Sequence, residues 1–221
     1  MSSTPAPERE RVPARPGAPG RPKDMEKASA ILEAGRRLFT THGFDGASMD
    51  QIAAEAGVSK LTVYSHYGDK DTLFAAVVRS YCEQNLPDSL FETAPEMPIR
   101  ERLIQVGRMF FAFISSPEAV AGHRIMCSPR MTDSALAEKF WEAGPQRVQR
   151  AFAELLGRRA ECGDLAIEDS ALAARQFLSL LKGDLHSRIA LGCCNHCADP
   201  DAHVAASVDF FLRAYAPRDA R

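Results

Sequence analysis

The chain has 221 residues, of which 45% are hydrophobic, and its formal net charge at pH 7 is −2. This length and apolar content allow a sizeable core in one domain or two, and the charge excludes a generally basic protein that coats nucleic acid. No apolar run is long enough to span a bilayer, and no signal-peptide hydrophobic region follows the N-terminus. We therefore expect a cytoplasmic protein without membrane partners, whose six cysteines stay mostly reduced.

The first segment, residues 1–23, is rich in proline, alanine, arginine and glycine. Such a composition cannot bury enough apolar surface to offset its chain entropy, so we expect a disordered basic arm. The arm could enter a DNA minor groove or remain an inert solvated tail, and the salt dependence of DNA binding would separate these alternatives. Its basic residues are Arg9, Arg11, Arg15, Arg21 and Lys23.

A helix is predicted from about Asp24 to His42, because apolar residues recur on one face at helical spacing. Gly43 then reads as the residue beyond the helix end, with Phe44 folding back on the helix in a Schellman-type ending. This helix would form the first part of a small helical domain.

Two short helices joined by a tight turn follow. Ser48 is a candidate N-cap, and Gln51 completes a capping box with it. Gly57 can take the left-handed conformation that ends one helix, and Ser59 can cap the next. Two helices joined in this way form a helix-turn-helix, which places its second helix in the DNA major groove. An ordinary helical hairpin with a polar face is the alternative.

The second of these helices has two distinct faces. Val63 and Tyr67 point toward the first helix, whereas Leu61, Thr62 and Ser65 point outward. Hydroxyl groups can bind base edges or phosphates, and methyl groups can contact thymine. Three larger polar side chains flank the outward set: Lys60, Tyr64 and His66.

The stretch that ends at Phe74 reads GRRLFTTHGFDGASMDQIAAEAGVSKLTVYSHYGDKDTLF, and it closely resembles the DNA-binding domain of TetR-type transcriptional regulators. The resemblance implies a three-helix DNA-binding domain, which we place at residues 24–84. The sequence departs from the family pattern at Leu61, where a small residue is usual, and at Tyr67, where phenylalanine is usual. Leu61 either sets a thymine-methyl preference or is simply tolerated, and the Tyr67 hydroxyl could reach a phosphate. The predicted DNA-binding residues are Ser48, Lys60, Leu61, Thr62, Tyr64, Ser65, His66, Tyr67 and Lys70.

A helix from Asp69 to about Asn85 follows, and the rest of the chain also reads as helical. Prolines stand at plausible first helical positions, glycines at plausible ends, and alternating strand patterns are absent. The predicted segments are 98–115, 117–128, 132–143, 145–162, 168–192 and 200–215. The fold class is therefore all-α, with a helical effector-binding and dimerisation domain at residues 85–221. Three stretches of this region resemble AefR-like regulators, a TetR subgroup: HRIM, FWEAGPQRVQRAF and QFLSLLKGDLHSRIALG.

The last two predicted helices each carry a broad apolar face. The resemblance implies that two such helices from each chain form a four-helix bundle in a homodimer. A two-fold dimer would read a near-palindromic double-stranded operator. The alternative is that these faces form the core of one chain. The faces comprise Leu172, Phe177, Leu180, Leu181, Leu185 and Ile189, and Val204, Val208, Phe211, Leu212 and Tyr215.

Bulky, soft side chains concentrate on neighbouring predicted helices of the C-terminal region. An apolar pocket with a few polar groups would suit a small apolar effector, although a plain core is the alternative. The predicted effector-binding residues are Phe110, Phe113, His123, Arg124, Met126, Trp141, Phe152 and His186.

The loop LGCCNHCADPDAH holds Cys193, Cys194, His196 and Cys197 close together. Such groups could bind zinc or copper(I) or form a redox switch, but the spacing is not a regular zinc pattern, so no metal or other cofactor is predicted. Nucleophile elbows, phosphate loops and dinucleotide fingerprints are absent, so we do not expect an enzyme.

Together these features predict a sequence-specific DNA-binding transcriptional regulator. The favoured form is a homodimeric repressor that a small apolar effector releases from its operator. The alternative is a metal- or thiol-responsive regulator that senses through the Cys193–Cys197 loop.

Overall fold

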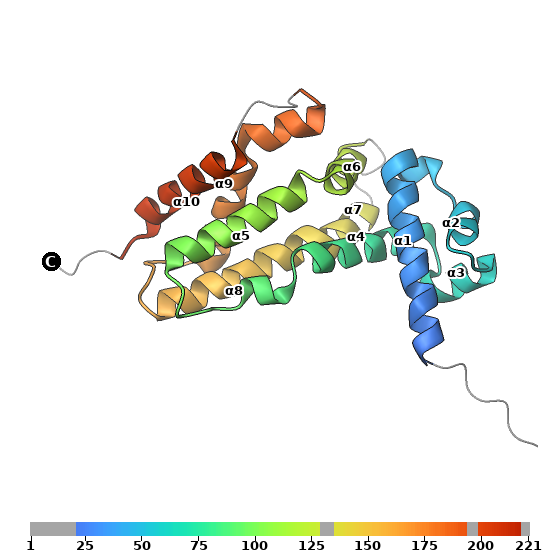
Figure 1. Ribbon diagram of the computed structural model, residues 1–221, viewed down its shortest axis with the longest axis horizontal. Coiled ribbons are helices and arrows are strands. Elements are labelled where there is room, and N and C mark those ends of the chain that lie inside the picture. Colours follow the sequence, from blue (N-terminus) through green and yellow to red (C-terminus); the bar gives the residue numbers. More distant parts are fainter. Residues whose placement is uncertain (1–20, 129–134, 194–198, 218–221) are drawn as a thin grey trace, which may run out of the picture.

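The computed structural model describes residues 21–128, 135–193 and 199–217, and within these ranges the chain forms helices and no strands. The N-terminal helices form a bundle at one end of an elongated molecule, and the C-terminal end of α10 lies at the other end (Figure 1). The N-terminal bundle comprises α1 (Arg21–Gly46), α2 (Met49–Glu55), α3 (Lys60–Tyr67) and the first half of α4 (Lys70–Asn85). The remaining elements are η1 (Asp88–Phe91), α5 (Ile99–Ile114), α6 (Pro117–Met126), α7 (Ala135–Trp141), η3 (Glu142–Gln146), α8 (Arg147–Glu161), α9 (Ser170–Leu191) and α10 (Pro200–Tyr215).

The helix-turn-helix forms as its local sequence predicts. Ser48 and Gln51 make the reciprocal capping box of α2, and Ser59 accepts a hydrogen bond from the backbone of Thr62 at the start of α3. Gly57 has a φ of 66°, a left-handed conformation that glycine adopts at little cost. These local interactions fix where α2 ends and where α3 begins.

Gly43 turns the chain sharply, with a φ of 70°. The ring of Phe44 returns onto that of Phe39, with 5.9 Å between centroids, and both rings contact Phe74 of α4. The predicted turn is confirmed, although α1 begins at Arg21 and helical geometry resumes briefly after Gly43.

The expected break at Gly144 and Pro145 is wrong, because α7 continues into α8 through the π-helical turn η3. A Cβ atom at Gly144 would lie 3.2 Å from the side chains of both Val78 and Cys82. The glycine therefore allows η3 to approach α4 closely, and the wider π turn accommodates the proline within the helix.

The sequence pattern predicted one regular helix over residues 168–192, and this prediction is wrong. The backbone leaves the helical conformation at Gly183, where φ is 47° and ψ is −158°. Nε2 of His203 on α10 lies 2.8 Å from the carbonyl oxygen of Leu181, just before the break. The hydrogen bond between His203 of α10 and Leu181 of α9 thus stabilises the break at Gly183, which the apolar periodicity of the segment did not predict.

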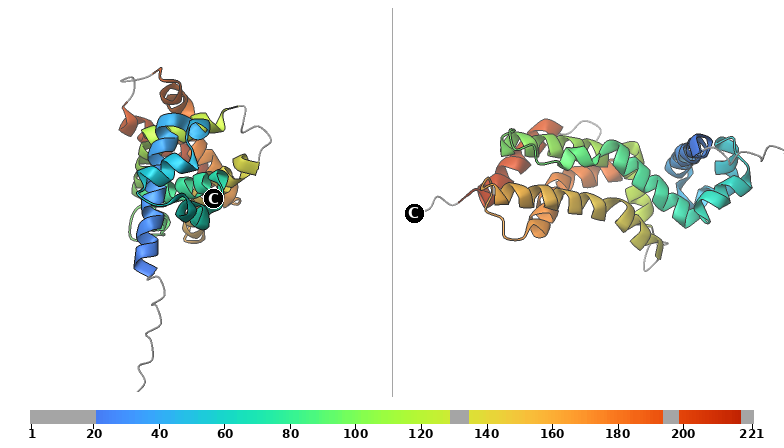
Figure 2. Two further views of the ribbon diagram at one scale, coloured as in Figure 1. Left: turned by 90° about the vertical axis from the view of Figure 1, so that its right-hand side faces the viewer. Right: turned by 90° about the horizontal axis from the view of Figure 1, so that it is seen from below.

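Two apolar clusters form the interior. One lies among α1–α4 and includes Leu136 of α7, and the other lies among η1, α5, α8, α9 and α10. α4 leaves the N-terminal bundle and runs into the C-terminal helices, as the other views also show (Figure 2). Because α4 and α7 pack together, the boundary proposed at residue 85 does not separate the two cores completely. Among the described helices, none combines the length and apolar character that crossing a membrane requires.

Most of the predicted dimerisation residues belong to the core of the single chain, which corrects that assignment. Phe177, Leu181, Leu185, Val204, Val208 and Phe211 are buried within the monomer. The reason is that α9 and α10 pack against each other and against α5, so each helix turns its apolar stripe inward. Leu180, Ile189, Leu212 and Tyr215 are partly buried, whereas Leu172 is exposed.

Candidate DNA interface and effector pocket

The outward face of α3 is solvent-exposed at the end of the molecule. Val63 is fully buried beneath it, in the same cluster as Ile52 of α2. Leu61 is 78% exposed, and Tyr64 and Ser65 are exposed beside it. The packing of α3 on α2 therefore directs the predicted base-reading side chains away from the protein.

Several predicted DNA-binding residues also have partners within the protein. Lys60 forms an exposed ion pair with Asp50 of α2, at 2.8 Å between Nζ and Oδ1. Thr62 Oγ1 lies 2.8 Å from the Ser59 hydroxyl, and Ser48 is engaged in its capping box. The exposed Lys60–Asp50 ion pair contributes little to stability, so Lys60 can exchange its carboxylate partner for a phosphate.

His66 and Tyr67, by contrast, turn toward α1. Nε2 of His66 lies 3.2 Å from a carboxylate oxygen of Asp24, and the Tyr67 hydroxyl donates to the carbonyl of Ala28 at 3.4 Å. Burial raises the pKa of Tyr67, so its hydroxyl stays protonated. Both side chains are positioned to hold α3 against α1, and a role in DNA binding remains a prediction for each.

Lys70, at the start of α4, connects three parts of the bundle. Its ammonium group donates to the carbonyls of Phe44 and Ala47 at 2.7 and 2.9 Å, and it lies 4.4 Å from the Phe44 ring centroid. Lys70 therefore positions the turn between α1 and α2, a role that its sequence context did not reveal.

Replacement of Lys70 by alanine is expected to weaken operator binding by about tenfold, because it removes hydrogen bonds from a charged group. Fluorescence anisotropy at several salt concentrations can identify the cause. If Lys70 also contacts a phosphate, the slope of log affinity against log salt concentration should fall by about one. An unchanged slope with reduced affinity would show that Lys70 acts only by positioning the turn, and an unchanged affinity would contradict both roles.

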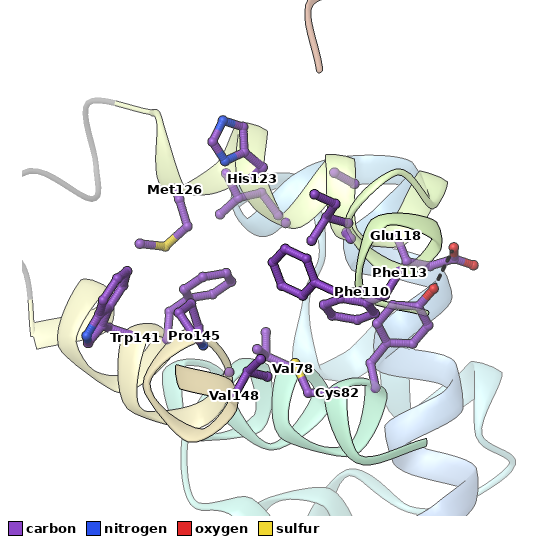
Figure 3. A pocket seen from close by; sticks show the side chains of 18 of the residues that line it. Val78, Cys82, Phe110, Phe113, Glu118, His123, Met126, Trp141, Pro145 and Val148 are labelled. Atoms are coloured by element: carbon purple, nitrogen blue, oxygen red, sulfur yellow. Dashed lines mark hydrogen bonds between the residues drawn. The ribbon is translucent and has the colours of Figure 1, made fainter. Parts of the chain in front are cut away.

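A cavity of about 360 Å³ lies between the DNA-binding bundle and the C-terminal helices. Side chains from α6 lie on one side of it, and those from α4, η3 and α8 lie on the other (Figure 3). Its size falls at the lower end of the range for small-molecule sites. Burial raises the pKa of Cys82 to about 11, so this thiol is a neutral part of the wall.

Six of the eight predicted effector-binding residues line this cavity: Phe110, Phe113, His123, Met126, Trp141 and His186. The other two lie elsewhere. Phe152 is fully buried between Phe91 and Phe177, so it belongs to the core. Arg124 lies on another side of α6, and its Nε donates to the carbonyl of Ala190 at 3.0 Å.

The cavity wall also contains polar groups that the sequence did not single out. At one end, Arg36 of α1 forms an ion pair with Glu118 of α6. The Tyr81 hydroxyl of α4 donates to Glu118 at 3.2 Å and to Ser116 at 3.0 Å. This Arg36–Glu118–Tyr81 network joins α1 of the DNA-binding bundle to α6, which forms one side of the cavity.

At the other end, the rings of His123 and His186 meet edge to face, with 5.2 Å between centroids. Burial and the neighbouring Lys182 ammonium lower the pKa of His123. Burial, His123 and Lys182 lower the pKa of His186, against the effect of a hydrogen bond to the carbonyl of Ile114. Both imidazoles are therefore less readily protonated than an exposed histidine.

Comparison with known proteins agrees with this geometry. Residues 31–77 match the family described as bacterial regulatory proteins, tetR family. Residues 101–217, more than half of the chain, match the AefR-like transcriptional repressor, C-terminal domain. The chain belongs to the TetR family.

Individual TetR-family proteins align along most of the chain. The transcriptional repressor AcnR of Corynebacterium efficiens is 26% identical over 173 residues, which is 77% of this chain and 85% of AcnR. A TetR-family regulator from Mesorhizobium loti has a TM-score of 0.77 at 28% identity and covers 88% of this chain and 98% of its own. The flavonoid-responsive regulator FrrA has a TM-score of 0.70 at 32% identity, covering 88% and 99%.

Family membership confirms the resemblance drawn from the sequence and the all-α fold class. As a TetR-family member, the protein is a DNA-binding transcriptional regulator and not an enzyme. The dimer, the effector, and the DNA-binding and effector-binding residues remain predictions for this TetR-family chain.

The cysteine loop of this regulator falls largely outside the described residues. Cys194, His196 and Cys197 lie there, and Cys193 is exposed at its edge. Within the described ranges, no group of three histidine, cysteine or carboxylate side chains could hold a metal ion. Residues 1–20 of the predicted basic arm also lie outside the described ranges, whereas residues 21–23 begin α1, so the prediction of disorder is wrong for these three residues.

Proposed function

We propose that the protein is a homodimeric repressor that binds a near-palindromic operator and leaves it when a small, largely apolar effector binds. The composition of the pocket wall carries this proposal. Arg36, Phe39 and Thr40 of α1 line the same cavity as residues of α6, η3, α8 and α9. A ligand in this cavity would therefore contact the DNA-binding bundle directly.

The exposed face of α3 supports the DNA-binding role assigned to it. Leu61 and Thr62 offer methyl groups to thymine, and Ser65 and Tyr64 offer hydroxyl groups to bases or phosphates. Lys60 can exchange its exposed carboxylate partner for a phosphate. In this arrangement Ser48 and Lys70 would hold the DNA backbone on either side of α3.

Exposed apolar side chains on the last two helices support a dimer. Leu172 of α9 and Phe210 of α10 are 42% and 55% exposed, although their neighbours are buried in the core. A second copy packed on these helices would cover both in an isologous interface. The two recognition helices would then face successive major grooves, about 34–36 Å apart.

The Arg36–Glu118–Tyr81 network offers a physical route from the pocket to DNA. Its three side chains line the cavity and belong to α1, α6 and α4. An effector that displaces α6 would shift Glu118 and therefore Arg36, which changes the position of α1 and its bundle. Release requires that the effector bind the displaced state more tightly than the DNA-bound state.

The similarity to FrrA suggests the first effectors to test. Flavonoids are flat and aromatic, and the apolar part of this cavity is lined by Phe110, Phe113, Phe140 and Trp141. A flat apolar molecule is therefore a suitable probe for this pocket.

The test measures binding of the purified protein to labelled DNA from the region upstream of its own gene, with and without 7-hydroxyflavone. We expect binding that strengthens as salt falls, and a weakening of about 5- to 150-fold when the flavone saturates the pocket. Glu118→Gln should bind the flavone but show a smaller release, because it loses the charge that pairs with Arg36.

Glu138→Gln, an exposed carboxylate on α7 outside the cavity wall, is the matched control and should release DNA like the wild type. Absence of specific DNA binding would contradict the regulator assigned to this face. Equal release by wild type and Glu118→Gln would contradict the route through Arg36.

A further inference from the structure

The side of the pocket formed by α9 is basic. Arg175, Lys182 and His186 all line the cavity, and Ser179 lies between the first two. Arg175, Ser179 and Lys182 recur at intervals of four and three residues, which places them along one side of α9 before its break at Gly183. Arg175, Ser179 and Lys182 are exposed, whereas His186 is buried, so the basic strip leads from the rim into the cavity.

His123 of α6 adds a fourth basic group to this strip. Its ring contacts that of His186, and the charge of Lys182 acts on both rings. Burial and the Lys182 charge disfavour the protonated forms of both imidazoles, so the Lys182 ammonium has neutral rings and no counter-ion among these groups. A negatively charged group placed among them would relieve this unbalanced charge by pairing with Lys182, and imidazole N–H groups can donate to it.

No carboxylate among the described residues of the cavity wall offers that relief. Glu118 is the single acidic residue of that wall, and it is engaged at the opposite end by Arg36 and Tyr81. His123 and Glu118 lie at separate ends of α6 (Figure 3). Asp184 is close in sequence, but it is exposed outside the wall and pairs with Arg188 at 3.6 Å.

The rest of the cavity is apolar and aromatic. Phe110, Met126, Trp141 and Val148 surround the space between α6 and the helices below it (Figure 3). Aromatic rings pack well against such side chains, whereas a charged group among them would lose its hydration. The pocket therefore has one end suited to rings and one end suited to negative charge.

We infer that the pocket binds a small aromatic acid, with its rings among Phe110, Met126 and Trp141 and its carboxylate or phenolate beside Lys182 and His186. This inference rests on the proposed function, in which the same cavity holds the effector. The basic strip would also disfavour cationic amphipathic molecules of similar size, since like charges repel.

The test compares two probes of nearly equal shape, 2-naphthoate and the neutral 2-naphthamide, by isothermal titration calorimetry with the full-length protein at pH 7. We expect the naphthoate to bind at least about tenfold more tightly, the size of one hydrogen bond to a charged group. Lys182→Met should remove most of this preference and leave the affinity for the amide nearly unchanged.

Arg188→Met is the matched control, because Arg188 is a cation of the same helix that lies outside the cavity wall. It should bind both probes like the wild type. Equal affinity for the two probes, no binding of either, or an unchanged preference in Lys182→Met would each overturn the inference. If both probes release operator DNA equally well, the proposed repressor stands and only the acidic ligand is rejected. If the naphthoate preference is found but operator DNA is never bound, the proposed repressor fails instead.

Discussion

Replacement of Phe152 by alanine is expected to lower the free energy of unfolding by about 3–5 kcal/mol, the usual cost of removing a buried phenylalanine. Phe152 is 0% exposed, and its ring centroid lies 6.4 Å from that of Phe91 and 5.0 Å from that of Phe177. The ring thus fills the space between η1, α8 and α9. Urea denaturation followed by far-ultraviolet circular dichroism measures the change.

Trp141→Ala is the informative comparison, because both aromatic residues were predicted to bind the effector. Trp141 is 46% exposed and lines the cavity, so its loss should cost only about 1 kcal/mol. It should weaken binding of 2-naphthoate, however. Both proteins must be compared at one concentration, since dimer formation would couple stability to concentration. A stability loss for Phe152→Ala no larger than that for Trp141→Ala would contradict its place in the core.

The contrast between these two residues shows what the sequence could predict about the pocket. Composition and helical spacing located the region, since six of eight chosen residues line one cavity. The same spacing could not separate Phe152 from Trp141, because an apolar residue on an amphipathic helix can face a core or a cavity. Only the packing of α8 on α9 decides between them.

The helix-turn-helix was predictable because its determinants are local. Ser48, Gln51, Gly57 and Ser59 each act on backbone groups within a few residues. Gly183 is different, because the apolar periodicity continues on both sides of this glycine, from Leu181 to Leu185, and so predicts an unbroken helix. Its left-handed conformation goes with a hydrogen bond from His203, which lies on another helix.

The Arg36–Glu118 ion pair could not be predicted from the sequence, because it too depends on a contact between distant helices. The two residues are 82 positions apart, and each stands on an ordinary helix with other charges nearby. Arg36 has Glu33 one turn away, which is the pair that helical spacing suggests. The long-range partner becomes visible only when α6 packs across α1.

Replacement of Leu61 by glutamate is expected to weaken operator binding by about a hundredfold or more, because like charges across an interface cost several kcal/mol. Leu61 is 78% exposed on the outward face of α3, so the new carboxylate would meet the phosphate-rich groove. The fold should tolerate the change, since an acidic residue is favourable in the first turn of a helix. Anisotropy with labelled operator DNA measures the affinity, and circular dichroism checks that the melting temperature is unchanged.

Leu61→Ala then tests whether the leucine side chain contacts a thymine methyl group. If Leu61 contacts a thymine methyl group, alanine should weaken binding by about 1–3 kcal/mol on the natural operator. The loss should be much smaller on an operator in which deoxyuridine replaces that thymine, because the methyl group is already absent. Such non-additivity is the signature of a direct contact.

Gln84→Glu provides the matched control, because it adds the same charge at an exposed position on α4, away from α3. It should leave operator affinity within about twofold, since distant exposed charges are largely screened. Equal affinities of Leu61→Glu and the wild type would show that this face of α3 does not meet DNA. A loss in Leu61→Ala that is the same with thymine and deoxyuridine would keep Leu61 in the interface but reject the methyl contact, so the exposed leucine would act by excluding water and not by choosing a base.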